Sequence, residues 1–189
     1  MDASAQRNAL AELARLIDGI GVVMMTTVAA DGALRSRPLL LESLEPDGSL
    51  VFLTHLSSQK VTELSHDARV NVAFVGDKGD RYVSVSGTGT FTHDPARMHE
   101  MWNPTYRAWF PNGPDDPDSA ILTVTIDRVE YWDVPSSRLV RLWGVVRAVA
   151  TGQVAEAGDH QTIEFGDSAP REQGQGSGIR DQGSGISKS

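Results

Sequence analysis

The chain has 189 residues, no cysteine and a formal net charge of −8, from 17 lysines and arginines against 25 aspartates and glutamates. This length suits one domain with a real core and argues against two large domains. The acidic balance argues against broad binding to nucleic acid, and the lack of cysteine excludes disulfides, thiol catalysis and cysteine-ligated metals.

The first twenty residues predict an amphipathic helix. Leu10, Leu13 and Leu16 recur at helical spacing, and Gly19 and Gly21 end the pattern. This segment lacks a basic stretch followed by an uninterrupted apolar run, and the longest apolar runs are too short to cross a bilayer. We therefore expect a cytoplasmic protein with no membrane contact.

Five strand-like runs follow, separated by turn sequences such as "DG" and "EPDGS". They cover residues 22–29, 33–41, 50–54, 69–75 and 81–92, and a helix over 57–67 interrupts them. Gly87, inside "SGTGT", predicts a bulge. The pattern predicts a mainly β fold with flanking helices, arranged as a small antiparallel barrel or sheet.

The second half predicts three further elements. A helix over 93–103 begins with Asp94 as its cap and Pro95 at the first helical position. A strand over 120–134 places Ile121 and Val129 on one face, opposite Leu122, and a last helix spans 136–152. We assign residues 1–151 to one domain and 152–189 to a disordered tail rich in Gly, Gln and Ser.

The corner "FLTHLSSQK", from Phe52 to Lys60, has two interpretations. Ser57 could cap the following helix while Lys60 is solvated. Alternatively, the hydroxyls, the lysine and the unpaired amides of the helix start form an anion site.

Strand 33–41 carries two arginines on one face. Arg35 and Arg37 alternate with Ser36 and Pro38, and two adjacent guanidiniums require either an anion or carboxylate partners. Ion pairs to Glu42 or Glu45 are the alternative to a bound anion. Because proline cannot donate to a β-ladder, the strand is at an edge or interrupted near Pro38.

Other side chains give weaker signals. The five histidines lack the spacing of a metal site, and no nucleophile elbow, phosphate-binding loop or dinucleotide fingerprint occurs. We therefore predict no metal site and assign no catalytic residue. The aromatic group at positions 102, 106, 109 and 110 favours a small core under a loop, with a cover for a flat ligand or a dimer contact as the alternative.

Together these stretches resemble the FMN-binding split-barrel proteins, the pyridoxamine 5'-phosphate oxidase-like group, and most closely its general stress protein branch. The matching segments are "TTVAADGALRSRPL", "LVFLTHLSSQKVTEL", "RVNVAFV", "YVSVSGTGTF", "MWNPTYRAWFPNG" and "VEYWD", which span roughly residues 22 to 134. Their order and spacing carry the resemblance.

The resemblance implies a six-stranded antiparallel split β-barrel that forms a homodimer, with flavin mononucleotide (FMN) bound at the interface by both chains. In the family pattern the phosphate is held by a basic residue on the second strand and by a T-x-x-x-S-x-K corner. The residues implied at the cofactor are Arg35, Ser36, Arg37, Pro38, Phe52, Leu53, Thr54, Ser58, Lys60, Trp109 and Trp132.

Three departures separate the chain from the oxidase proper. Glu42 stands where the oxidase has a further lysine, Gln59 replaces a second basic residue, and nothing after Trp132 matches the segment that grips the pyridoxal substrate. The resemblance therefore favours an FMN-dependent oxidoreductase with an unidentified acceptor and a reduced nicotinamide as possible donor. A non-enzymatic flavin-binding or flavin-buffering stress protein is the alternative. A weaker alternative keeps the barrel but exchanges FMN for a deazaflavin or haem.

Overall fold

The computed structural model describes residues 3–76, 81–133 and 159–165. Its helices are α1 (Ala3–Ile17), α2 (Gln59–His66), α3 (Pro95–Met101) and a 3₁₀ helix, η1 (Pro104–Ala108). Its strands are β1 (Val22–Val28), β2 (Leu34–Leu44), β3 (Ser49–His55), β4 (Arg69–Val75), β5 (Arg81–Thr92), β6 (Ser119–Asp133) and β7 (Asp159–Glu164). The helix expected over 136–152 lies outside the described residues.

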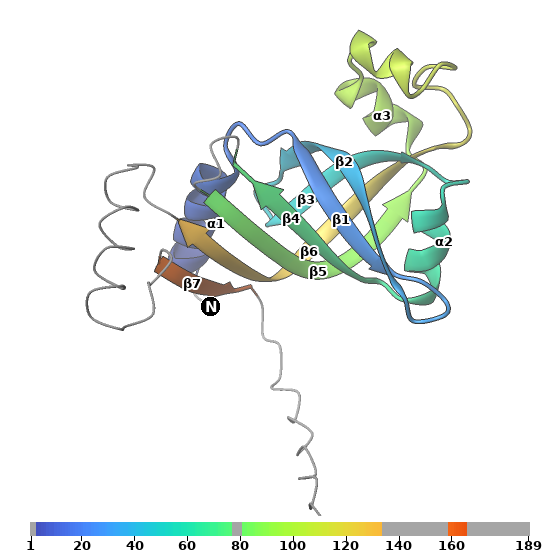
Figure 1. Ribbon diagram of the computed structural model, residues 1–189. Coiled ribbons are helices and arrows are strands. Elements are labelled where there is room, and N and C mark those ends of the chain that lie inside the picture. The colour runs from blue at the N-terminus through green and yellow to red at the C-terminus, as the bar shows by residue number, and fades with distance from the viewer. Residues whose placement is uncertain (1–2, 77–80, 134–158, 166–189) are drawn as a thin grey trace, which may run out of the picture.

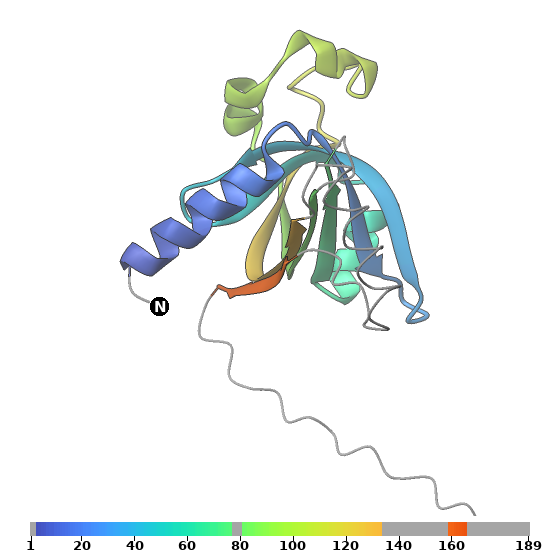
Figure 2. The same ribbon diagram turned by 60° about the vertical axis from the view of Figure 1, so that its left-hand side comes forward.

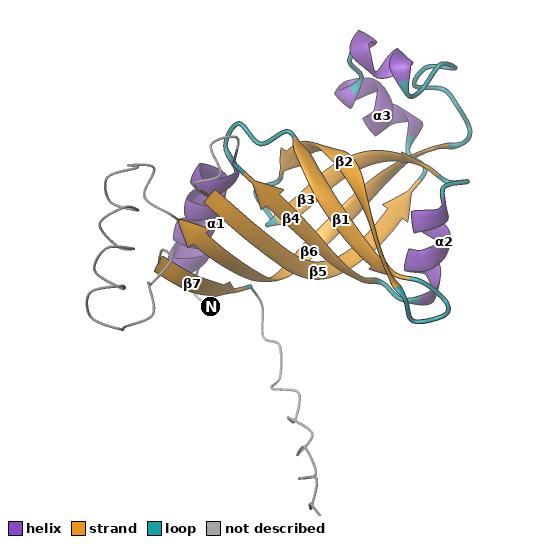
Figure 3. Ribbon diagram, viewed as in Figure 1, coloured by secondary structure: helices purple, strands orange, loops and turns teal. Residues whose placement is uncertain are grey.

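The strands form a closed antiparallel barrel (Figure 1). Neighbours follow the order β3-β2-β1-β4-β5-β6, and a further pairing between β3 and β6 closes the ring. Figure 3 shows the strands forming the barrel wall, with the helices at its periphery. The expected six-stranded antiparallel barrel is therefore confirmed.

Strand β6 pairs with two different strands along one edge. Its residues 119–125 pair with β3, and residues 128–133 pair with β7. Phe165 directly follows β7, and its side chain is buried in the main core. Residues 159–165 lie inside the range predicted as a disordered tail, and for them that expectation is wrong. The short, polar sequence of β7 does not by itself predict a strand. Pairing with the edge of β6 stabilises it.

The predicted bulge at Gly87 is confirmed. The pairing of β5 with β6 shifts register between Ser86 and Gly87. A Cβ atom on Gly87 would lie 2.1 Å from the carbonyl oxygen of Thr125, so only glycine fits there. The shift also changes which side of β6 faces inward: Leu122 and Val129 are both buried in the main core, although simple alternation placed them on opposite faces.

The helices cover different parts of the barrel. Helices α1 and α2 lie at opposite ends, and α3 with η1 stands above the rim (Figures 1 and 2). Leu13 and Leu16 of α1 are fully buried in the main core, which is worth roughly 1.5–3 kcal/mol for each side chain. Arg81 donates to the carbonyls of Arg15, Leu16 and Asp18 at distances of 3.1–3.2 Å, which satisfies the C-terminal end of α1.

The predicted start of α3 is confirmed. Asp94 is its N-cap and accepts a 3.0 Å hydrogen bond from the amide of Arg97, while Pro95 takes the first helical position. In the described part of the chain, no helix is long and apolar enough to span a membrane.

Candidate functional site

The candidate site lies where β2 separates from β3. The two strands pair only between residues 41–44 and 50–52, whereas residues 34–40 of β2 pair with β1 alone. Pro38 pairs with Met24 of β1 and lies on this stretch, whose other edge pairs with no described strand, a position that suits a residue without a backbone donor. The separation leaves an opening between the edge of β2 and the end of β3.

A cavity of about 460 Å³ fills this opening, which is within the range of small-molecule sites. Its walls come from β1, β2, β3, α2 and the segment containing η1. The lining residues are Val22, Pro38, Leu39, Leu40, Glu42, Leu53, Thr54, His55, Lys60, Tyr106, Trp109 and Phe110. The walls are mainly apolar, with a cation and a hydroxyl at the α2 corner.

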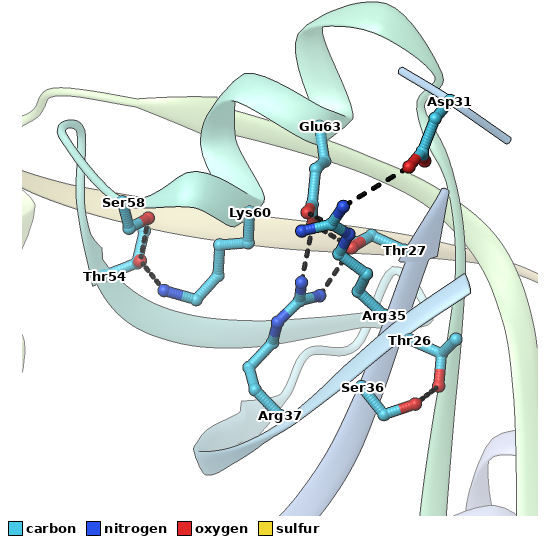
Figure 4. A network of polar contacts seen from close by, with 10 residues as sticks. All are labelled: Thr26, Thr27, Asp31, Arg35, Ser36, Arg37, Thr54, Ser58, Lys60 and Glu63. Carbon is cyan, nitrogen blue, oxygen red and sulfur yellow. Dashed lines mark hydrogen bonds and ion pairs between the residues drawn. The ribbon is translucent and has the colours of Figure 1, made fainter. Parts of the chain in front are cut away.

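The capping interpretation of that corner is wrong. Ser57 donates its hydroxyl to Asp118 at 2.6 Å, and Ser58, the actual N-cap of α2, makes no side-chain capping bond. The hydroxyl of Ser58 instead lies 3.3 Å from that of Thr54, which accepts a 2.8 Å hydrogen bond from the ammonium of Lys60. Two hydroxyls and one cation therefore meet at the helix start (Figure 4).

Lys60 has an unusual electrostatic environment. Burial and the positive charge of Arg37 lower its pKa, and the negative charge of Glu63 partly opposes them. Within the described residues Lys60 forms no ion pair with a carboxylate, and its hydrogen bond goes to a neutral hydroxyl. A bound anion would relieve the repulsion between the two cations.

Arg37 is held beside Lys60 by a buried carboxylate. It donates to Glu63 and to Thr27, each at 2.5 Å, and Thr27 also donates to Glu63 (Figure 4). Burial raises the pKa of Glu63, but the hydrogen bonds from Thr27 and Arg37 and the nearby positive charges outweigh it, so the net shift is downward. Glu63 therefore remains a carboxylate at 4% exposure.

Sequence analysis missed Glu63. Its alternative to a bound anion, ion pairs to Glu42 or Glu45, is wrong, because Arg37 pairs with Glu63 across 26 positions. The available signal was a glutamate three residues after Lys60, on a short helix that must bury one side.

Arg35 and Ser36, like Arg37 and Ser58, are not among the lining residues of the cavity. Arg35 contacts Asp31 at 3.5 Å and lies 3.9 Å from Glu63. The hydroxyl of Ser36 lies 2.7 Å from that of Thr26, away from the α2 corner (Figure 4). Arg35 and Ser36 therefore flank the cluster around Arg37 and make no contact with Lys60 that the structure shows as a hydrogen bond.

The remaining expected residues divide into three groups. Pro38, Leu53 and Trp109 line the cavity, and Trp109 is 63% exposed. Phe52 points into the main core, so only its backbone can border a ligand. Trp132 lies in the half of β6 that pairs with β7, and it is not among the lining residues of this chain's cavity.

Most of the aromatic group forms the expected small core. Trp102 contacts Tyr106 and Phe110 edge-on, with ring centroids 5.9 and 6.4 Å apart. His55, which sequence analysis did not assign, stacks on Phe110 at 4.5 Å and its Nε2 lies 3.0 Å from the carbonyl oxygen of Trp109. This contact holds the segment after η1 against the end of β3.

Glu42 and Tyr106 form a second polar group of the cavity. The Tyr106 hydroxyl donates a short hydrogen bond to Glu42. Burial raises the pKa of Glu42, which this hydrogen bond partly offsets, while burial and the neighbouring carboxylate raise the pKa of Tyr106 to about 12. The phenol therefore stays protonated and remains the donor.

Comparison with known proteins gives one consistent family. The model of the pyridoxamine 5'-phosphate oxidase-like family matches residues 8–156. Protein bli-3 of Neurospora crassa is 28% identical over 142 residues, covering 70% of this chain and 68% of that protein. A pyridoxine/pyridoxamine 5'-phosphate oxidase of Baumannia cicadellinicola is 37% identical over 78 residues, covering 41% of this chain and 35% of that protein.

Solved structures share the fold. The general stress FMN/FAD binding protein of Xanthomonas citri has a TM-score of 0.55 and is 27% identical, covering 70% of this chain and 90% of its own. A protein related to general stress protein 26 from Clostridium acetobutylicum has a TM-score of 0.62 at 19% identity, covering 84% of this chain and 96% of its own.

Proposed function

Because the chain belongs to the pyridoxamine 5'-phosphate oxidase-like family, we propose that it is an FMN-binding protein of the general stress type and acts as a flavin-dependent oxidoreductase. The similarity to the Xanthomonas citri FMN/FAD binding protein supports a flavin as the ligand. The observation that carries the proposal is the cluster of Lys60, Thr54 and Ser58 at the start of α2.

This cluster fits a phosphate. The ammonium of Lys60 is partly buried beside Arg37, and its nearest polar partner is the neutral hydroxyl of Thr54. The start of α2 adds backbone amides without a side-chain cap and the positive end of the helix dipole. Arg37, Thr54, Ser58 and Lys60 would hold the phosphate, with Arg37 kept in place by Glu63.

The apolar part of the cavity fits a flat ring. Pro38 and Leu40 on the unpaired edge of β2 face the opening, and Leu53 on β3 borders it from the other side. Open backbone groups on β2 can hydrogen-bond the polar edge of the ring. The bound flavin supplies the electron transfer, and this chain binds and orients it.

A second copy of the chain would complete the site. Val22, Met24 and Leu40 are 63%, 43% and 41% exposed on adjacent strands, where Val22 pairs with Leu40 and Met24 with Pro38. This apolar surface is continuous with the cavity wall and has the character of a protein interface. We propose a homodimer in which this surface is buried. In that homodimer Trp132 of the second copy would approach the flavin.

Replacing Lys60 with alanine tests the phosphate assignment. The variant loses a charge-assisted hydrogen bond worth about 1.5–3 kcal/mol, so FMN affinity falls about ten- to a hundredfold. Riboflavin lacks the phosphate, so its affinity changes by less than about 0.5 kcal/mol. Flavin fluorescence titrations measure both, and Gln59→Ala serves as the control at the exposed neighbouring position. Equal FMN affinities in parent and Lys60→Ala protein would remove the phosphate site.

Replacing Met24 with lysine tests the dimer. A charge in the centre of the apolar surface is expected to yield a monomer and to weaken FMN binding at least about tenfold. Leu34→Lys is the matched control, because Leu34 is 73% exposed at the other end of β2. Light scattering with FMN titration measures both effects, and a monomer that keeps the parent FMN affinity contradicts the shared site.

The absorption spectrum of protein purified without added cofactor tests the ligand class. Flavin bands support the proposal, whereas a haem Soret band contradicts it. Oxidation of a reduced nicotinamide in air by the FMN-loaded protein then tests turnover, and its absence would favour flavin binding without catalysis.

A further inference from the structure

The two polar groups of the cavity carry opposite charge. The cations Lys60 and Arg37 lie at the α2 corner, whereas Glu42 lies five residues beyond Arg37 on β2. At about 3.3 Å per residue these positions are some 16 Å apart along the strand. Both Lys60 and Glu42 line the same cavity.

Glu42 retains one oxygen for a ligand. The hydroxyl of Tyr106 donates to Oε2, and among the described residues no other group donates to this carboxylate and no cation pairs with it. The Tyr106 bond holds the carboxylate in a cavity that is also lined by the apolar side chains of Leu40, Leu53 and Phe110. In such surroundings an unpaired negative charge interacts more strongly with an incoming charge than it would in water.

The pKa values agree with this geometry. The raised pKa of Glu42 reflects burial without a cationic partner, and a cationic ligand would return the pKa toward its ordinary value. Because the pKa of Tyr106 is raised, the phenol keeps its proton at any ordinary working pH and donates it in the hydrogen bond to Glu42.

We propose that Glu42, positioned by Tyr106, selects the substrate of this pocket. A planar molecule with a cationic or strong hydrogen-bond-donor group binds at this end, and a carboxylate or phosphate at the same place is rejected. This inference rests on the proposed function, because it assigns to the substrate the part of the cavity that remains once the flavin is bound.

Three probes of the same shape test the selection. Benzamidine is a cation, benzamide is neutral and benzoate is an anion, and isothermal titration of FMN-saturated protein measures each affinity. We expect the parent to prefer benzamidine over benzoate at least about tenfold, as gain or loss of a charge-assisted hydrogen bond predicts. In Glu42→Gln the preference shrinks below about threefold, with unchanged FMN affinity and melting temperature.

Two further variants sharpen the result. Tyr106→Phe retains the carboxylate but frees it, so the preference keeps its sign and becomes smaller, and a full-sized preference would remove the positioning role of Tyr106. Glu45→Gln is the matched control, because Glu45 is three residues along the chain and outside the cavity lining. It is expected to match the parent.

The outcomes separate this inference from the proposed function. If Glu42→Gln keeps the preference of the parent, or if benzamidine displaces FMN, the substrate assignment is wrong while FMN binding stands. If the protein binds no FMN, the same titrations on flavin-free protein still report whether Glu42 sets the charge preference.

Discussion

Two glutamates beside the same cavity show opposite behaviour. Glu63 on α2 is 4% exposed, yet its pKa lies below the ordinary value, because Thr27 and Arg37 donate hydrogen bonds that outweigh burial. Glu42 on β2 is less buried, yet its pKa is raised, because burial outweighs the hydrogen bond from Tyr106, its only donor among the described residues. Hydrogen-bonding and charged partners, and not depth of burial alone, set the direction in which the pKa of each carboxylate shifts.

The difference also explains the roles proposed for the two regions. At the α2 corner Glu63 neutralises part of the positive charge and orients Arg37, and Lys60 is left to meet an anion. At the Glu42 end no cation of the described residues pairs with the carboxylate, which is left to meet a donor. The same residue type therefore supports an anion site in one region and opposes an anion in the other.

The largest expected effect comes from removing Arg37. Arg37→Leu leaves the buried carboxylate of Glu63 without its main partner, so we expect a loss of about 2–3 kcal/mol in unfolding free energy, less than for a fully buried pair because Arg37 keeps some exposure. Urea unfolding measures it. Arg35 lies 3.5 Å from a carboxylate oxygen of Asp31 and 3.9 Å from one of Glu63, so Arg35→Leu should lower the unfolding free energy by less than about 1 kcal/mol.

A double variant separates charge from shape at the same pair. Arg37→Leu with Glu63→Leu removes both charges, so it should be more stable than Arg37→Leu alone. If the double variant is less stable than the single one, the pair acts through packing and the comparison of the two glutamates fails.

A smaller effect comes from removing each neutral donor. Thr27→Val keeps the side-chain shape and removes the buried hydrogen bond to Glu63 together with the acceptor for Arg37, at an expected cost of about 1–2 kcal/mol. Tyr106→Phe removes the corresponding donor at the partly exposed Glu42, at about 0.5–1 kcal/mol. Thermal unfolding with calorimetry compares the two, and equal costs would show that burial does not distinguish the regions.

The smallest effect is a difference in pH dependence. Glu63, with its lowered pKa, contributes stability that is present above its ordinary value of 4.5 and is lost as the pH falls below it. Glu42, with its raised pKa, contributes stability that is present below 4.5 and is lost as the pH rises through its folded-state pKa. Urea unfolding across a pH series measures both contributions. In Glu63→Gln the unfolding free energy should depend less on pH on the acid side, and in Glu42→Gln it should depend less on pH above 4.5. Shifts of the same sign would contradict both assignments.

The sequence predicted the strands and helices that carry the site better than the side-chain contacts between them. Alternation along β2 and the turn into α2 were enough to bring Arg37 and Lys60 toward one corner, because strand and helix periodicity fix those directions. The contacts of Glu63 and Tyr106 depend on how α2 and η1 pack against β2, which no local pattern encodes. The same limit applies to β7, whose pairing with β6 stabilises a segment of low intrinsic preference.

The closure of the barrel has a consequence for the order of folding. Ser49 on β3 pairs with Thr125 on β6, 76 positions further along the chain, so this contact carries a large loop-closure entropy and is expected to form late. The cavity uses β3 and the segment between β5 and β6, so it exists only after that step. A ligand of the cavity should therefore slow unfolding while leaving the folding rate unchanged, and stopped-flow kinetics with and without FMN would measure both rates.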